Sequence, residues 1–206
     1  MCQAPAVLHV GEGKGADALE PFWGRLRAGG AKIEVVATDL SPACIGVVAR
    51  HLPEATLVFD RFHVVKLYNE KLSQLRRELY AQLKDTMAES VLKGIRWLLL
   101  KRPENLDPSR NAPERLGEGL GLNEPLATAY YLKEELSEIR DQEEREQAEA
   151  LLMDWILYAE STKIPMPVKF AKTVRLHAFG ILAWYDYPVS TGALEGTNNK
   201  IKTTKR

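Results

Sequence analysis

The chain has 206 residues, a length that corresponds to one or two domains of ordinary size. With 45% apolar, 27% charged and 8% aromatic residues, it has the composition of a globular protein with a real core. The 28 basic and 28 acidic side chains cancel, which excludes a uniformly basic nucleic-acid-binding protein. Two cysteines exclude a disulfide-rich scaffold. No apolar run approaches the ~18–20 residues of a membrane span and no signal peptide is visible, so we expect a cytoplasmic protein without membrane contact.

The first sixty residues alternate strand-like runs with helical ones. The short apolar runs Ala6–Val10, Ile33–Ala37 and Thr56–Phe59 predict strands. Between them, Ala16–Ala28 has apolar residues at helical spacing, and the serine–proline pair at 41–42 is typical of a helix start. This order predicts an α/β layer in which helical crossovers join parallel strands.

After Asp60 the pattern is helical throughout. A long amphipathic helix is predicted from apolar residues three and four positions apart, namely Val65, Tyr68, Leu72, Leu75, Leu79 and Leu83. Further helices are predicted over 91–101, 124–140, 147–162 and 168–185, and a proline-bounded break is predicted over 103–113. This part of the sequence reads as an all-helical block attached to, or inserted into, the α/β layer.

Charge is unevenly distributed along the helical block. Residues 61–102 hold ten basic and four acidic side chains, and 163–206 hold eight basic and two acidic, so each stretch has a net charge of +6. Residues 134–160 hold two basic and ten acidic side chains, for a net charge of −8. The acidic stretch is typical of a solvated helix face. For the basic stretches, solvated lysines and a phosphate-binding face both remain open.

Two aspartates directly follow predicted strands. Asp39 comes after Ile33–Ala37 and Asp60 after Thr56–Phe59, positions where parallel sheets collect functional groups and where a carboxylate can bind a divalent cation. His63 follows Asp60 by three residues, so the pair could share a metal or form a hydrogen bond that fixes the imidazole tautomer. Simple capping of the following helices explains both aspartates as well.

The carboxyl-terminal segment carries an unusual polar face. If residues 190–202 form a helix, Glu195, Asn198, Asn199 and Lys202 lie on one side of it. Such a face is a poor core stripe. It suits a hard cation, held by carboxylate oxygen, together with phosphate, held by amide and ammonium donors. A solvent-exposed helix is the alternative.

Four segments carry a family likeness. They are Val36–Ala43, Leu52–Lys66, Leu92–Lys101 and Leu194–Lys202. Together, in this order and over nearly the whole chain, they resemble the DDE domain of bacterial insertion-sequence transposases of the ISL3 branch.

The resemblance implies an α/β fold: a ribonuclease-H-like mixed sheet with a large all-helical insertion before the last catalytic helix. Residues 1–62 would form a partial core, 63–187 the insertion and 188–206 the final helix. In this family three carboxylates hold two Mg²⁺ ions, which activate a water or a DNA 3′-hydroxyl and stabilise the leaving oxygen.

Residue by residue, the resemblance makes Asp39 the second carboxylate and Glu195 the third, both as metal ligands and catalytic groups. Asp60 and His63 would support the site, although Asp60 is an alternative for the second carboxylate. DNA would be contacted by one lysine of the long helix and by the last motif, that is, by Lys66, Asn198, Asn199, Lys200 and Lys202.

The chain departs from the family pattern at its start. The strand that carries the first aspartate, and the strand after it, have no counterpart before Ala6–Val10. We therefore expect an incomplete sheet whose open strand edge favours self-association or pairing with a full-length transposase, and a fragment that is inactive alone. Two other functions remain open: a non-catalytic helical module that binds DNA or a partner chain, and a small metal-dependent phosphohydrolase.

Overall fold

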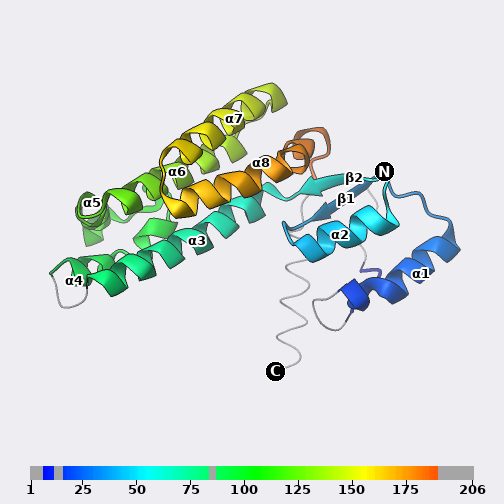
Figure 1. Cartoon of the computed structure of the whole chain (residues 1–206), viewed down its shortest axis with the longest axis horizontal. Coiled ribbons are helices and arrows are strands. Elements are labelled where there is room, and N and C mark those ends of the chain that lie inside the picture. The colour runs from blue at the N-terminus through cyan, green and yellow to red at the C-terminus, as the bar shows by residue number, and fades with distance from the viewer. Residues whose placement is uncertain (1–6, 12–15, 84–86, 190–206) are drawn as a thin grey trace. The chain divides into compact units, whose positions relative to one another are not determined.

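The computed structural model describes residues 7–11, 16–83 and 87–189, and the chain folds as two compact units (Figure 1). The first unit is formed by Met1–Asp60 together with Phe179–Arg206, and the second by Arg61–Ala178. The predicted limits at residues 62 and 187 separate a core, an insertion and a catalytic helix, which is a division by role and not by compactness. These limits remain predictions.

The first unit has a mixed α/β architecture. A short 3₁₀ turn, Ala16–Leu19, leads into α1 (Glu20–Gly29), and β1 (Val35–Thr38) and β2 (Thr56–Phe59) flank α2 (Pro42–His51). The two strands are parallel, with the register running from Val35↔Thr56 to Thr38↔Phe59 (Figure 1). The crossover helix α2 buries Val47 and Val48.

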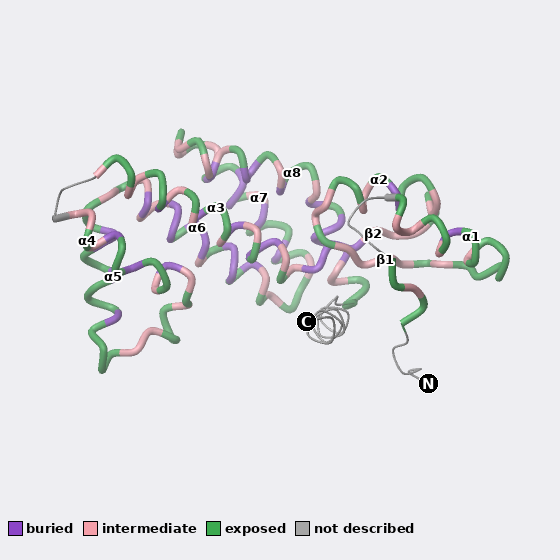
Figure 2. The backbone as a smooth tube through the Cα atoms, turned by 90° about the horizontal axis from the view of Figure 1, so that it is seen from below, coloured by how far each residue is buried: buried purple, intermediate pink, exposed green. Residues whose placement is uncertain are grey.

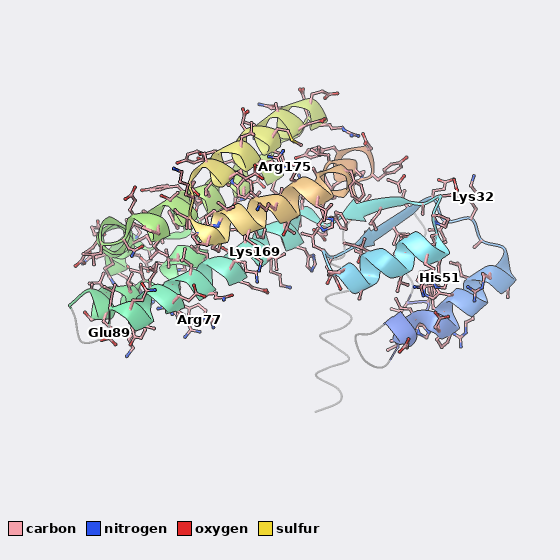
Figure 3. The ribbon with its side chains drawn as sticks, in the orientation of Figure 1. Lys32, His51, Arg77, Glu89, Lys169 and Arg175 are labelled. Carbon is pink, nitrogen blue, oxygen red and sulfur yellow. The ribbon has the colours of Figure 1, made fainter. Side chains whose placement is uncertain are left out.

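Aromatic stacking packs α1 against the end of α2. Trp23 on α1 is 4% exposed and stacks on the His51 ring, with centroids 4.9 Å apart and planes at 8°. The imidazole also lies within 3.2 Å of the Arg27 guanidinium and 3.7 Å of the Glu20 carboxylate. Figure 3 shows His51 between the two helices. These contacts fix α1, whose own apolar stripe is weak.

The expectation that Ala6–Val10 is a strand is not met in the residues that the structure describes. Residues 7–10 have no strand conformation, and the side chains of Val7, Leu8 and Val10 are 50%, 71% and 60% exposed. Within the described part of the chain the sheet consists of β1 and β2. An apolar run becomes a strand only where a neighbouring strand accepts its backbone hydrogen bonds, and residues 7–10 lack such a neighbour here. The fold class is therefore α/β with a small parallel sheet, and a ribonuclease-H-like sheet is not established.

The second unit is helical in its described residues. Its helices are α3 (Arg61–Gln82), α4 (Met87–Gly94), α5 (Ala112–Gly121), α6 (Glu124–Arg140), α7 (Arg145–Ser161) and α8 (Pro165–Asp186), whose last residues belong to the first unit. Short 3₁₀ turns at Leu98–Leu100, Pro103–Asn105 and Pro108–Arg110 connect α4 to α5. In this part of the chain no helix is both long and apolar enough to cross a membrane.

An aromatic cluster forms the centre of the helical unit. Tyr68 on α3 is fully buried, and its ring meets Phe170 of α8 at 4.9 Å and Trp155 of α7 at 5.9 Å, both edge-on. The Tyr68 hydroxyl donates to the Ala129 carbonyl at 3.1 Å, and the Trp155 indole donates to the Leu132 carbonyl at 2.8 Å. Figure 2 shows the buried positions of α3, α6, α7 and α8 gathered along this core. Burial raises the pKa of the Tyr68 hydroxyl, and the negative charge of Glu135 acts in the same direction.

Polar groups reinforce the same unit. Lys133 on α6 is 2% exposed, and its Nζ donates to the carbonyls of Leu99 (3.1 Å) and Lys101 (2.9 Å) while pairing with Glu134. Burial lowers the pKa of Lys133, and Glu134 opposes that effect. At the surface, Nε and Nη2 of Arg175 on α8 (labelled in Figure 3) donate to the two oxygens of the Glu160 carboxylate of α7.

The segment between α3 and α6 differs from the prediction. The helix expected over 91–101 ends as α4 at Gly94, and Trp97, which follows in a turn, is 64% exposed. Helix α5 has no counterpart among the predicted helices, and its first residues overlap the proline-bounded break that was predicted over 103–113. Pro113 lies in the first turn of α5, where the missing N–H costs nothing.

Candidate active site

The two strand-end aspartates lie on one edge of the sheet. Thr38 and Phe59 form the last pair of the parallel register, so Asp39 and Asp60 each follow it by one residue. The ladder extends one step further, because the Asp60 N–H donates to the Thr38 carbonyl at 3.3 Å. Neighbouring strands lie about 4.7–4.9 Å apart, so the backbones that carry the two carboxylates are adjacent. The predicted placement of both groups at the carboxyl ends of parallel strands is confirmed.

The two carboxylates occupy different environments. Asp39 is exposed, and its Oδ1 accepts a hydrogen bond from the Ser41 N–H at 3.1 Å. Ser41 is the N-cap residue of α2 but makes no capping bond with its own side chain, so the Asp39 carboxylate serves the turn that begins the helix. Asp60 is 2% exposed. Asp39 is therefore the one of the pair that a solvent-borne ligand can reach directly.

Two further residues of the predicted site, one proposed to support it and one to contact DNA, lie at the start of α3. His63 is half-buried in the first turn, and Lys66 is exposed one turn further on. Because Asp60 precedes Arg61, the first residue of α3, the strand-end aspartate and the histidine are separated by less than one helical turn of sequence. The positions of Asp60 and His63 agree with the predicted order of a strand, an aspartate and a helix.

The third carboxylate and most of the predicted DNA contacts fall outside the described residues. These are Glu195, Asn198, Asn199, Lys200 and Lys202. Among residues 7–11, 16–83 and 87–189, no group of three His, Cys, Asp or Glu side chains lies close enough together to hold a metal ion. The convergence of Asp39 with Glu195 stays a prediction.

One surface feature next to Lys66 was not expected from the sequence. A groove of about 350 Å³ lies along the first half of α3, and its lining includes Phe62, Asn69 and Arg140. Arg140 belongs to the end of α6, far from α3 in sequence. The only sequence signal was the basic–aromatic pair Arg61-Phe62, which the resemblance placed inside a motif without assigning it a role.

The comparisons with known proteins identify the class of protein. The sequence model of a transposase family, the DDE type of the ISL3 group, matches residues 1–206. The transposase for insertion sequence element IS1001 of Bordetella parapertussis is 36% identical over 203 residues, which cover 97% of this chain and 50% of that protein. The transposase for IS1557 of Mycobacterium tuberculosis is 29% identical over 198 residues, which cover 85% of this chain and 44% of that protein. No solved structure matches the chain significantly.

The chain belongs to the ISL3 family of transposases, which confirms the resemblance carried by its motifs. It spans about half the length of the curated relatives that it matches.

Proposed function

We propose that this chain is part of the catalytic core of a DDE transposase, which cleaves DNA at the ends of an insertion sequence and joins it to a target. The observation that carries this proposal is the parallel pair β1–β2, whose two carboxyl ends are each followed directly by an aspartate. Family membership supports the same reaction class. Bacterial DNA lies in the cytoplasm, and we place the activity there.

The residues present suit a hard divalent cation. We propose Mg²⁺, held by the Asp39 and Glu195 carboxylates, because carboxylate oxygens are its preferred protein ligands. When bound, the ion supplies an activated water or 3′-hydroxyl and stabilises the leaving oxygen of the phosphodiester. The Ser41 N–H donates to one oxygen of Asp39, which restricts the orientation of the carboxylate. Asp60 and His63 support this arrangement from the end of β2 and the first turn of α3.

Lysine and amide side chains are proposed to position the DNA. Lys66 is exposed on α3, so its ammonium group can contact a phosphate at the surface. Asn198, Asn199, Lys200 and Lys202 follow Glu195 in the same motif and are proposed to hold phosphates beside the reacting bond. Such contacts release counterions. The logarithm of the DNA-binding constant should therefore fall linearly with the logarithm of the salt concentration.

We further propose that the isolated chain does not complete the reaction. Two carboxylates hold a second ion weakly, and the family reaction uses three. In the described residues β1 pairs with β2 alone, which leaves a strand edge that another chain can extend. Self-association, or pairing with a full-length transposase, is the proposed consequence.

Binding of Mn²⁺, a paramagnetic substitute for Mg²⁺, tests the site directly. Electron paramagnetic resonance should show bound Mn²⁺ with the natural chain and at least a tenfold weaker affinity with Asp39→Asn or Glu195→Gln. The matched control is Asp154→Asn, an exposed aspartate in α7. Equal Mn²⁺ affinity in all four proteins would remove the proposed site.

The same preparations separate the alternatives. Salt-sensitive DNA binding that is independent of metal and of both carboxylates would favour the non-catalytic helical module. Metal-dependent hydrolysis of p-nitrophenyl phosphate by the chain alone would favour the phosphohydrolase.

A further inference from the structure

An exposed aromatic ring lies at the amino end of the groove on α3. Phe62 is 55% exposed, although a phenylalanine normally gains free energy from burial. Its ring forms part of the lining of the groove of about 350 Å³, together with Lys66, Asn69 and Glu70 on successive turns of the same helix. That volume is at the lower end of the range of small-ligand sites, about 300–1,000 Å³.

Two arginines lie close to this ring. The Cζ atom of Arg140 is 5.1 Å from the ring centroid and that of Arg61 is 6.0 Å away. The Arg61 guanidinium donates to the backbone carbonyl of Arg140, which ties the start of α3 to the end of α6. Asp141 accepts two hydrogen bonds from Arg140, at 2.8 and 3.1 Å, and so fixes its guanidinium. The ring and the cations are therefore held in place before any ligand arrives.

Asn69, one of the residues that line the groove, also has an unsatisfied polar atom. Oδ1 of Asn69 is shielded from solvent and has no hydrogen-bond partner among the described residues. A shielded amide oxygen without a partner costs free energy, and a ligand that donates an N–H to it recovers that cost. Glu70 offers a second acceptor in the same lining, and Lys66 offers a cation.

We propose that this groove holds one unpaired nucleobase of a DNA strand. The base stacks on Phe62, its edge meets Asn69, and the adjoining phosphates lie at Lys66 and Arg140. Single-stranded nucleic acids are bound in this way, by aromatic platforms beside cations, because every base has a π-face and every linkage a negative charge. The inference rests on the proposed function in one respect, namely that the ligand strand belongs to DNA.

Fluorescence anisotropy with a labelled 20-nucleotide single strand of mixed sequence tests the proposal, in EDTA and at one fixed salt concentration. Removing one stacking platform should weaken binding by about 5- to 150-fold in Phe62→Ala. Phe62→Trp should keep the affinity of the natural chain, because tryptophan also offers a stacking face. Tyr131→Ala is the matched control, because Tyr131 is an equally exposed aromatic (58%) on α6 of the same unit, and binding should remain unchanged.

A direct readout follows from photochemistry. A strand that contains 5-iododeoxyuridine should cross-link on irradiation to the tryptophan of Phe62→Trp, and mass spectrometry of the peptides locates the bond. Asn69→Leu should reduce the affinity for the strand and alter the ranking of homopolymer strands, because it removes the group that meets the base edge.

Three outcomes overturn the proposal: unchanged binding in Phe62→Ala, an equal loss in Tyr131→Ala, or no affinity for single strands in EDTA. None of them bears on the metal site, whose Mn²⁺ test needs no DNA. Conversely, a natural chain that binds no Mn²⁺ but still binds the single strand through Phe62 would contradict the proposed catalytic site and support the nucleobase site. If the first of the three outcomes is accompanied by tighter binding of a duplex than of the single strand, the surface binds phosphates only.

Discussion

The backbone N–H of Asp60 donates a hydrogen bond to the carbonyl oxygen of Thr38 across 3.3 Å, one step beyond the last residue pair of the parallel sheet. This bond places the residue after β2 beside the residue after β1, where Asp39 lies. The two aspartates share an edge but not an environment, since Asp39 is exposed and Asp60 is 2% exposed. Their substitution should therefore have different consequences.

Asp60→Ala should lower the free energy of unfolding by about 1–3 kcal/mol, because the Asp60 side chain is buried and buried polar groups are normally hydrogen-bonded, so its removal leaves groups around it unsatisfied. Asp39→Asn should change it by less than about 0.5 kcal/mol, because asparagine keeps the oxygen that accepts from the Ser41 N–H. Urea unfolding followed by circular dichroism measures both. Equal destabilisation by the two substitutions would contradict the assigned difference in burial.

Two tryptophans provide a matched pair in the helical unit. Trp155→Ala should cost about 3–5 kcal/mol, because it removes a buried ring from the contacts with Tyr68 and Phe170 and frees the Leu132 carbonyl. Trp97→Ala should cost less than about 1 kcal/mol, since that ring is 64% exposed and contacts the Arg96 guanidinium at 4.5 Å.

Thermal unfolding of the two variants beside the natural chain measures this difference. Both tryptophans lie in stretches of helical periodicity, which does not distinguish them. A melting temperature lowered equally by both substitutions would contradict the exposure of Trp97 and would mean that its ring is buried.

Much of the fold follows from local signals in the sequence. The strand Thr56–Phe59 and the helix Glu124–Arg140 have the predicted bounds. The helix is well specified because the Asn123 side chain accepts from the Leu126 N–H at 3.0 Å at its start. Hydrophobic periodicity and capping chemistry are short-range, and they could be predicted without knowledge of the packing.

Helix α5 could not be predicted in the same way, because its stability depends on packing. Gly119 lies against Ile95, where a Cβ would come within 2.5 Å of the isoleucine Cδ1. A glycine that weakens the helix locally is therefore required by a close approach of another segment. The Phe62–Arg140 contact could not be predicted either, because it joins residues 78 positions apart in the sequence. The strand-end aspartates were predictable, and the groove on α3 was not.

The pH dependence of stability should include a contribution from His177 on α8. Partial burial lowers the pKa of His177 below its ordinary value of 6.5, because charging the ring there costs solvation. Between the lowered pKa and 6.5 the unfolded chain binds more protons than the folded one, so stability increases with pH in that window. The contribution is fully present above pH 6.5 and is lost as pH falls through the folded-state pKa.

His177→Gln should therefore make the chain less sensitive to acid. Urea midpoints measured at pH 7.5 and pH 5 should fall more for the natural chain than for the variant. Carboxylates titrate equally in both proteins, so the difference between the two falls isolates the histidine. Identical falls would show that the histidine has an ordinary pKa in the folded chain.

The last prediction concerns the close approach of α8 to β2 within the first unit. A Cβ added at Gly180 would lie 2.5 Å from Cδ2 and 2.6 Å from Cε2 of Phe59, and 3.1 Å from the Leu57 carbonyl oxygen. Phe59 is fully buried, so its ring has little room to move. Overpacking of this kind typically costs ~1–3 kcal/mol. It opposes the gain of ~1 kcal/mol that alanine brings to a helix interior. We expect the clash to dominate and Gly180→Ala to lower the midpoint of urea unfolding.

Gly46→Ala is the matched control, because Gly46 lies in the interior of α2 and a Cβ there would meet nothing within 4 Å. That substitution should raise stability by up to ~1 kcal/mol, since only the helix propensity changes. A double-mutant cycle then assigns the cause. If the phenyl ring is the obstacle, Gly180→Ala should cost less in a Phe59→Leu background than in the natural chain, because the smaller side chain makes room for the methyl group. An unchanged cost would point to the Leu57 carbonyl instead, and a stabilising Gly180→Ala would mean that α8 does not approach β2 this closely.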